Sequence, residues 1–165
     1  MGKATDMWTP EGQRFMKELR ELAELEVRIG YQRGAEAVLP ENDASRADLV
    51  DIVMWNEFGT SSKYGNEHIL SRPFMRDSVD KHMDAINHVL TAQKDALLNG
   101  ASAREILGEL GLFQQDLIQT EIEQGDFVAN AESTIKRKGS DKPLIDTGAM
   151  KNGVHYYIVE KGSMD

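Results

Sequence analysis

Apolar residues recur at helical spacing in several parts of the chain. Between Glu11 and Glu24 they fall three or four positions apart among charged residues, the pattern of an amphipathic helix. The stretch from Arg46 to Phe58 predicts a second helix, with Ser45 placed to cap its exposed N–H groups. Longer patterns at 72–99 and 102–124 predict two further helices. Only a short glycine-containing turn separates those two, so we expect them to pair antiparallel.

Two shorter stretches show the period-two alternation of half-buried strands. Apolar residues alternate with polar or small ones at 27–31, near the start of the chain, and again at 154–158, near its end. Strands near both ends with helices between them predict an α+β fold in which the final strand pairs with the early one. We therefore expect a small, mainly antiparallel sheet together with a long antiparallel helix pair.

A stretch with strong boundary signals lies between the second and third predicted helices. Gly59 favours a helix end, because glycine readily takes the left-handed conformation that closes a helix. Pro73 fits the first turn of the next helix, where its missing N–H has no intrahelical partner anyway. The residues between are polar and rich in turn formers, which predicts a loop presented at the surface. Phe74 stands at the head of an apolar helix face and is expected to be buried, anchoring the loop.

Three short motifs follow one another along the chain: Glu57-Phe58-Gly59-Thr60, Ile69-x-x-Arg72-Pro73-Phe74 and Leu144-Ile145-Asp146-Thr147-Gly148-Ala149-Met150. With the Gly/Ser-rich loop between the first two, their order and separation resemble the tail-completion or neck proteins of tailed bacteriophages, also called virion-morphogenesis or minor tail proteins. The resemblance covers roughly residues 27–158. Leu70 and Gly153 depart from the family pattern, which has proline and serine at these positions.

The resemblance implies a structural assembly protein at the junction of head and tail, acting by protein–protein binding rather than catalysis. Its implied partners are phage tail and connector proteins, and it is expected to form a homo-oligomer, for which a ring is one arrangement. Its implied place is the virion, after assembly in the bacterial host cytoplasm. The residues expected to contact partners are Glu57, Phe58, Gly59, Thr60, Lys63, Tyr64, Arg72, Pro73, Phe74, Lys136, Arg137 and Lys138.

Composition favours one domain and excludes some kinds of site. A chain of 165 residues with 40% hydrophobic content can bury one sizeable core, so we expect a single domain over 1–165. Residues 1–10 are expected to be loosely ordered and 135–143 to form a flexible loop. The absence of cysteine excludes disulfides and thiolate metal sites. We expect no membrane contact and no signal segment, because no apolar run is long enough to cross a bilayer and the start is not apolar.

The formal charge of −9, from 28 acidic and 19 basic residues, argues against a protein that grips phosphate backbones, so we expect no specific nucleic-acid binding. An acidic surface suits either a wall along which DNA slides or simple solubility. The basic stretch at 136–138 runs against this trend. It is either a docking segment for an acidic partner or DNA, or a solvated loop. Residues 59–66 and 136–142 lack apolar anchors, so we expect both to be mobile in the free chain and ordered in the assembled particle.

Candidate catalytic chemistry is sparse. The four histidines are scattered, and we expect no metal, no cofactor and no catalytic residue. Ser61 to Lys63 have side chains suited to nucleophilic catalysis, but no nucleophile-elbow or P-loop pattern surrounds them. Asp146-Thr147-Gly148 spells the aspartic-protease triplet, yet the chain has no second such triplet, so only a homodimer would supply the partner carboxylate. We expect these three residues to form a turn, and a hydrolase that uses Asp146 or Ser61–Lys63 is the alternative function.

Gly108 and Gly111 lie inside the last predicted helix, where each costs about 1 kcal/mol of helix propensity relative to alanine. One interpretation is close approach by another helix or another subunit. The other is a kink or a local break in the helix.

Overall fold

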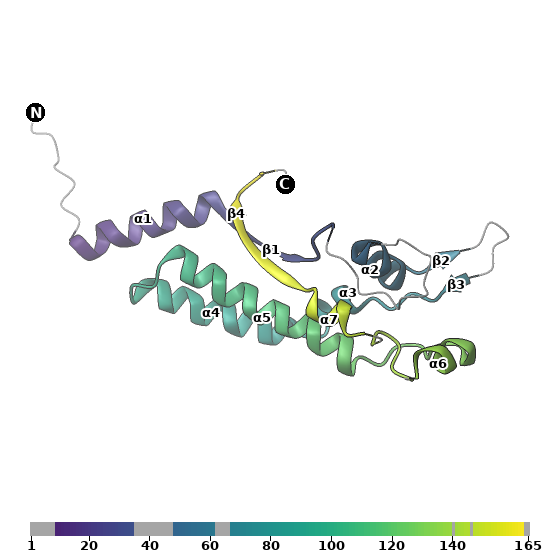
Figure 1. Ribbon diagram of the computed structural model, residues 1–165. Helices are drawn as coiled ribbons and strands as arrows, with labels where there is room; N and C mark the ends of the chain where they lie inside the picture. Colours follow the sequence, from purple (N-terminus) through teal and green to yellow (C-terminus); the bar gives the residue numbers. More distant parts are fainter. Residues whose placement is uncertain (1–8, 35–47, 62–66, 140, 146, 164–165) are drawn as a thin grey trace, which may run out of the picture. The chain divides into compact units, whose positions relative to one another are not determined.

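The structure, a computed structural model, describes residues 9–34, 48–61, 67–139, 141–145 and 147–163 (Figure 1). These residues form seven helices and four strands, and the predicted α+β class is confirmed. The internal contacts separate the chain into two compact units. Unit 1 comprises Met1–Arg28, Asp84–Leu112 and Tyr156–Asp165, and unit 2 comprises Ile29–Met83 and Phe113–His155.

The helices of unit 1 are α1 (Pro10–Glu24), most of α4 (Met83–Leu98) and the start of α5 (Ala103–Gln124). Thr9 caps α1, because its hydroxyl oxygen accepts a hydrogen bond from Gly12 N at 3.2 Å. α4 and the start of α5 run antiparallel and are joined by a turn at Gly100, whose φ of 106° suits glycine (Figure 1). The predicted antiparallel helix pair is confirmed in this part of the chain.

Side chains from two directions hold the first turn of α5. Ser102 N donates to Glu105 Oε2 at 2.7 Å while Glu105 N donates to Ser102 Oγ at 3.2 Å, a reciprocal capping box. Ala103 N donates to Oε2 of Glu18, a buried residue of α1, at 2.8 Å. Ser102 therefore caps α5, and the Glu18 carboxylate joins α1 to the beginning of the same helix.

The first sheet consists of β1 (Leu25–Gly30) and β4 (His155–Glu160). Lys161 N donates to Glu24 O at 2.7 Å, so the end of β4 meets the start of β1 and the pairing is antiparallel (Figure 1). The predicted pairing of the final strand with the early one is confirmed.

The glycines of α5 lie beneath this sheet. A Cβ added to Gly111 would be 2.4 Å from Cδ2 of Tyr156 on β4, and one added to Gly108 would be 3.8 Å from the Tyr156 hydroxyl. α5 continues through both positions, so the interpretation as a break is wrong. Close approach is the correct interpretation at Gly111, although the approaching group belongs to the chain's own strand rather than to a helix or another subunit.

The elements of unit 2 are α2 (Leu49–Phe58), β2 (Thr60–Ser61), β3 (Glu67–Ile69), α3 (Phe74–Asp80), the rest of α5, α6 (Glu132–Lys138) and α7 (Ala149–Asn152). Its core includes Leu49, Val53, Phe74, Ile118, Ile122, Leu144, Met150 and Val154. Phe74 is fully buried, as predicted. Tyr31 meets it edge-on with ring centroids 6.5 Å apart, and the Tyr31 hydroxyl donates to Met150 O at 2.8 Å. Burial raises the pKa of this phenol, which keeps the hydroxyl protonated as a donor.

The predicted helix at 72–99 is wrong as a single element, because Lys81 and His82 separate α3 from α4. His82 N donates to Val79 O at 3.1 Å, the three-residue spacing of a tightened last turn. The Lys81 ammonium lies 3.2 Å from the Glu121 carboxylate of α5. No glycine or proline marks this break, so the apolar pattern runs through it unchanged.

The start of α2 also differs from the prediction. The helix begins at Leu49 instead of Arg46, and its cap is Asp48. Ser45, the predicted cap, lies outside the described residues. The Asp48 carboxylate accepts hydrogen bonds from Gly34 N at 2.9 Å and Val50 N at 3.2 Å. These backbone hydrogen bonds lower the pKa of Asp48.

Part of the predicted flexible loop at 135–143 is helical, because α6 extends to Lys138. Glu132 in its first turn and the basic residues at its end complement the helix dipole, which favours this short helix. Gly139, with φ of 69°, ends it.

Candidate partner-binding site

The candidate site is built on the segment that leaves α2 and returns to α3. Gly59 ends α2 with φ of 73°, and a Cβ there would lie 2.9 Å from Ile69 O, so the position requires glycine. Thr60 pairs with Ile69 in the antiparallel β2–β3 sheet. The predicted loop therefore starts and ends as a short hairpin. Lys63 and Tyr64, two predicted contact residues, lie outside the described residues.

Glu57 joins the base of this hairpin to α3. It is 5% exposed, and its carboxylate accepts hydrogen bonds from Met75 N at 3.0 Å and Arg76 N at 3.2 Å. α3 has no side-chain cap of its own, so Glu57 supplies acceptors to its first turn from the neighbouring helix. Ser71 Oγ donates to Glu57 O at 2.8 Å, which brings the two ends of the hairpin together.

Arg72 fastens the same region to the segment after α5. Its buried side chain donates from Nε to Val128 O at 3.0 Å and from Nη2 to Asn130 Oδ1 at 3.1 Å. Nη1 donates to Asn56 Oδ1 at 3.3 Å, and Arg72 N donates to Asn56 O at 2.6 Å. No carboxylate in the described part of the chain pairs with this guanidinium, and burial lowers its pKa. We call Glu57, Ser71 and Arg72 the hairpin junction.

The predicted contact residues with described side chains fall into two groups. Those buried within the chain are Glu57, Arg72 and Phe74. Those exposed or partly exposed are Phe58, Gly59, Thr60, Pro73 and Lys136. Only the second group is open to a partner, and Glu57 and Arg72 of the first group hold the chain on either side of the hairpin in position. Arg137 and Lys138 lie at the end of α6, with side chains outside the described set.

Sequence reasoning missed Asn56 and Asn130, the side-chain acceptors of Arg72. Asparagine has a low helix propensity, so its presence within α2 at position 56 is a signal for a specific role. Asn130 lies in a connection, where asparagine is common, so nothing in the sequence marks it.

The triplet at 146–148 precedes α7. Asp146 lies outside the described residues. Thr147 Oγ1 accepts a hydrogen bond from Ala149 N at 3.3 Å, and Gly148 has φ of 80°. These two residues bend the chain just before α7.

Gly153 follows α7 at a closely packed position. A Cβ at this position would lie 2.5 Å from Leu49 Cδ2 and 2.9 Å from Ala149 O. Serine has no room here without a shift of α2 or α7.

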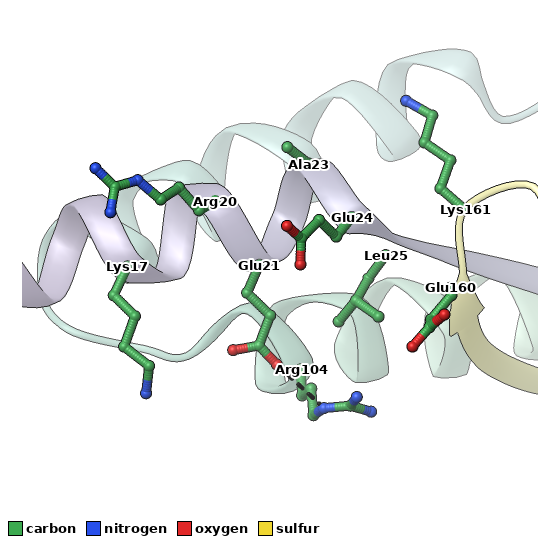
Figure 2. A pocket seen from close by; sticks show the side chains of 9 residues that line it. All are labelled: Lys17, Arg20, Glu21, Ala23, Glu24, Leu25, Arg104, Glu160 and Lys161. Atoms are coloured by element: carbon green, nitrogen blue, oxygen red, sulfur yellow. Dashed lines mark hydrogen bonds and ion pairs between the residues drawn. The ribbon is translucent and has the colours of Figure 1, made fainter.

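A second candidate site is an open pocket in unit 1, between α1, the ends of β1 and β4, and α5 (Figure 2). It is lined by Lys17, Arg20, Glu21, Ala23, Glu24, Leu25, Arg104, Glu160 and Lys161. The basic side chains of Lys17, Arg20 and Lys161 extend in different directions, as Figure 2 shows. Arg104 Nε is already paired with Glu21 Oε1 at 3.2 Å. The pocket therefore lacks the converging donors that an anionic ligand requires.

Among the described residues, no three histidine, aspartate or glutamate side chains are grouped so as to hold a metal ion. Within the same part of the chain, no helix is long and apolar enough to cross a membrane. Comparisons with protein-family models, curated proteins and solved structures found no match.

Proposed function

We propose that this chain is a structural subunit of a tailed bacteriophage that acts at the head–tail junction by binding tail and connector proteins. One observation carries the proposal. Three residues of the family-like motifs, Glu57, Gly59 and Arg72, shape the hairpin and fix its base. A motif that fixes both ends of an exposed segment suits a protein whose task is to bind neighbouring proteins.

The hairpin junction holds the hairpin in place before any partner binds. Its two ends are held by the Ser71 hydrogen bond to α2 and by the Glu57 cap on α3. A segment whose ends are fixed before binding loses less conformational entropy when it docks. The contact residues are then the exposed group around Phe58 and Thr60, together with Lys63 and Tyr64 from the sequence motif.

The basic residues Lys136, Arg137 and Lys138 supply a second contact in this proposal. Lys136 is exposed on α6. A basic segment on a chain with a net charge of −9 suits an acidic neighbour in the particle. In the same proposal the chain is a homo-oligomer of the virion, assembled in the host cytoplasm, and it performs no catalysis.

Deletion of the gene from the phage genome that encodes it tests the proposal. Filled heads and finished tails should accumulate unjoined, and electron microscopy counts them. Adding the purified chain to that lysate should restore joined, infectious particles. The Arg72→Ala variant should restore fewer joined particles than the parent chain, because the hairpin junction loses its hydrogen bonds to the segment after α5. Arg33→Ala, a change at an exposed arginine, should restore as many as the parent chain. Normal particles and full infectivity without the gene would refute the proposal.

A further inference from the structure

The Arg72 side chain connects the hairpin to a second exposed segment of unit 2. Arg72 lies just after β3, and its backbone N donates to Asn56 O at 2.6 Å, which fixes the end of the hairpin on α2. Its guanidinium donates from Nη2 to Asn130 Oδ1 at 3.1 Å and from Nε to Val128 O at 3.0 Å. Both acceptors lie just before α6, which begins at Glu132. A residue of the hairpin junction therefore sets the point at which the chain enters α6.

Asn130 also closes the segment that carries α6. Its Nδ2 donates to Lys142 O at 3.3 Å, so one side chain joins the two ends of this segment. We call the chain from Asn130 to Lys142 the α6 arm, of which Ser140 lies outside the described residues. The core of unit 2 resumes at Leu144, which is 4% exposed. The α6 arm is thus held at both ends, as the hairpin is.

The two asparagines and the guanidinium form one continuous series of hydrogen bonds. Asn56 Nδ2 donates to Ile52 O at 2.8 Å within α2, and Asn56 Oδ1 accepts from Arg72 Nη1 at 3.3 Å. Arg72 then donates to Asn130, and the series ends at Lys142 O. Arg72 is 6% exposed. A buried guanidinium with acceptors in two other segments favours one arrangement of those segments, because any other leaves donors unpaired away from water.

The hairpin and the α6 arm differ in charge. The α6 arm has four basic and two acidic residues, a formal charge of +2 in a chain that carries −9. Between Thr60 and Ile69 the hairpin has one lysine and one glutamate, a formal charge of zero. The two segments together fit a protein that is acidic opposite the α6 arm and uncharged opposite the hairpin. DNA carries its charge evenly along its length, so it matches the α6 arm alone.

We infer that the hairpin and the α6 arm are two parts of one interaction surface for a single protein partner, and that Asn130 is the positioning residue that sets their spacing. The inference rests on the proposed function for the role of the two segments as contacts. Their spacing, however, is a property of the free chain. When the spacing is fixed beforehand, a partner that meets one segment meets the other without a further loss of conformational entropy.

Spin labels measure the spacing in the free chain. The chain has no cysteine, so two introduced cysteines carry the labels at known positions. Ser61→Cys places one label on β2 and Lys136→Cys places the other on α6, and both positions are exposed. Pulsed electron spin resonance then gives the distribution of distances between the labels, which should have one peak. Asn130→Ala should broaden that peak, because the α6 arm loses its bonds to Arg72 and to Lys142 O.

Two further variants separate positioning from a general loss of stability. Asn130→Asp keeps the acceptor for Arg72 and loses the donor to Lys142 O, so its distribution should be intermediate in width. Gln119→Ala is the matched control, because Gln119 Nε2 donates to Lys151 O at 3.1 Å, again a side-chain amide on a backbone oxygen of unit 2. The control should keep the distribution of the parent chain. All variants are compared where circular dichroism shows them fully folded.

Cross-linking in the joined particles of the complementation assay identifies what the surface meets. A photoreactive group on Ser61→Cys and one on Lys136→Cys, in separate preparations, should attach to the same protein chain. Attachment to two different proteins, or to DNA from Lys136→Cys, would overturn the inference. Equal distance distributions for the parent chain and Asn130→Ala would overturn it too. A parent chain that restores no particles refutes the proposed function instead, and the distance distributions then decide whether Asn130 sets the spacing.

Discussion

Glu57 belongs to one helix and completes another. Its backbone lies in the last turn of α2, while its carboxylate satisfies two N–H groups in the first turn of α3. A helix that begins after proline has few local ways to satisfy those groups, and α3 has no side-chain cap of its own. The Glu57 carboxylate, although it belongs to α2, therefore serves as the N-terminal cap of α3.

Replacing Glu57 by alanine should lower the free energy of unfolding by about 1–3 kcal/mol, because Met75 N and Arg76 N lose their acceptors in a buried position. Glu57→Gln keeps one amide oxygen as an acceptor and should lose less. Urea unfolding measures both variants, and Glu24→Ala, at an exposed position on α1, is the control. Equal midpoints for Glu57→Ala and Glu24→Ala would show that the cap contributes nothing.

Phe58 and Phe74 lie on either side of the hairpin and differ sharply in exposure. Phe74 is 0% exposed and Phe58 is 61% exposed. Phe74→Ala should cost about 3–5 kcal/mol, through lost burial and the cavity left behind. Phe58→Ala should change stability by less than about 0.5 kcal/mol, because most of its side chain is already exposed to water. Thermal melting of both variants tests this, and a Phe74→Ala melting temperature within a degree or so of the parent's would contradict the anchoring role.

Among the elements, α5 gives the sharpest contrast, because its two glycines differ in the space around them. Gly108→Ala should stabilise the chain by up to about 1 kcal/mol, since a Cβ there would make an ordinary contact 3.8 Å from the Tyr156 hydroxyl. Gly111→Ala should destabilise it, since a Cβ there would lie 2.4 Å from the Tyr156 ring. Denaturant unfolding of the two variants decides the point. Tyr156→Ala should reverse the sign of the Gly111→Ala effect, and failure of that rescue would mean that the strand does not crowd the helix.

Long and well-bounded elements could be predicted from the sequence, and short ones could not. α1 and α5 carry a sustained apolar period and clear end signals, so their predicted limits agree with the structure within a residue or two. β2 and β3 span two and three residues, too few to show a period. The break between α3 and α4 depends on a tightened turn and on an ion pair with α5, and neither leaves a mark in the local sequence.

The candidate site was predictable in its outline only. Gly59 and Phe74 were identified by the helix end and by the apolar face, because those signals are local. The role of Glu57 was not, since its acceptors serve backbone groups 18 and 19 positions further along the chain. Arg72 likewise reaches Val128 and Asn130 across 56 and 58 positions. Such pairings are set by tertiary contact, which no sequence period encodes.

At the scale of the whole molecule, the chain passes between unit 1 and unit 2 four times, after Arg28, Met83, Leu112 and His155. Neither unit is a continuous piece of chain, and β1, α5 and β4 each contribute to both. Elements shared in this way couple the two units, so we expect one cooperative unfolding transition, as for a single domain.

Urea unfolding followed by far-ultraviolet circular dichroism and by tryptophan emission tests this coupling. The two curves should coincide, and Phe74→Ala in unit 2 should shift both equally. Separate transitions, of which Phe74→Ala moves only one, would show that the units unfold independently.

The pairing of β1 with β4 also means that the sheet can form only near the end of translation. β1 ends at Gly30 and β4 begins at His155, so 124 residues lie between the two partners. At roughly 5–20 residues per second, β1 waits about 6–25 s on the ribosome before its partner exists. Throughout that interval its edge is open to other extended chains, and a chance encounter then competes with the correct one. A polypeptide released before residue 155 never closes this sheet. An incomplete copy therefore leaves β1 without its partner strand, because within the described residues β1 pairs only with the last strand.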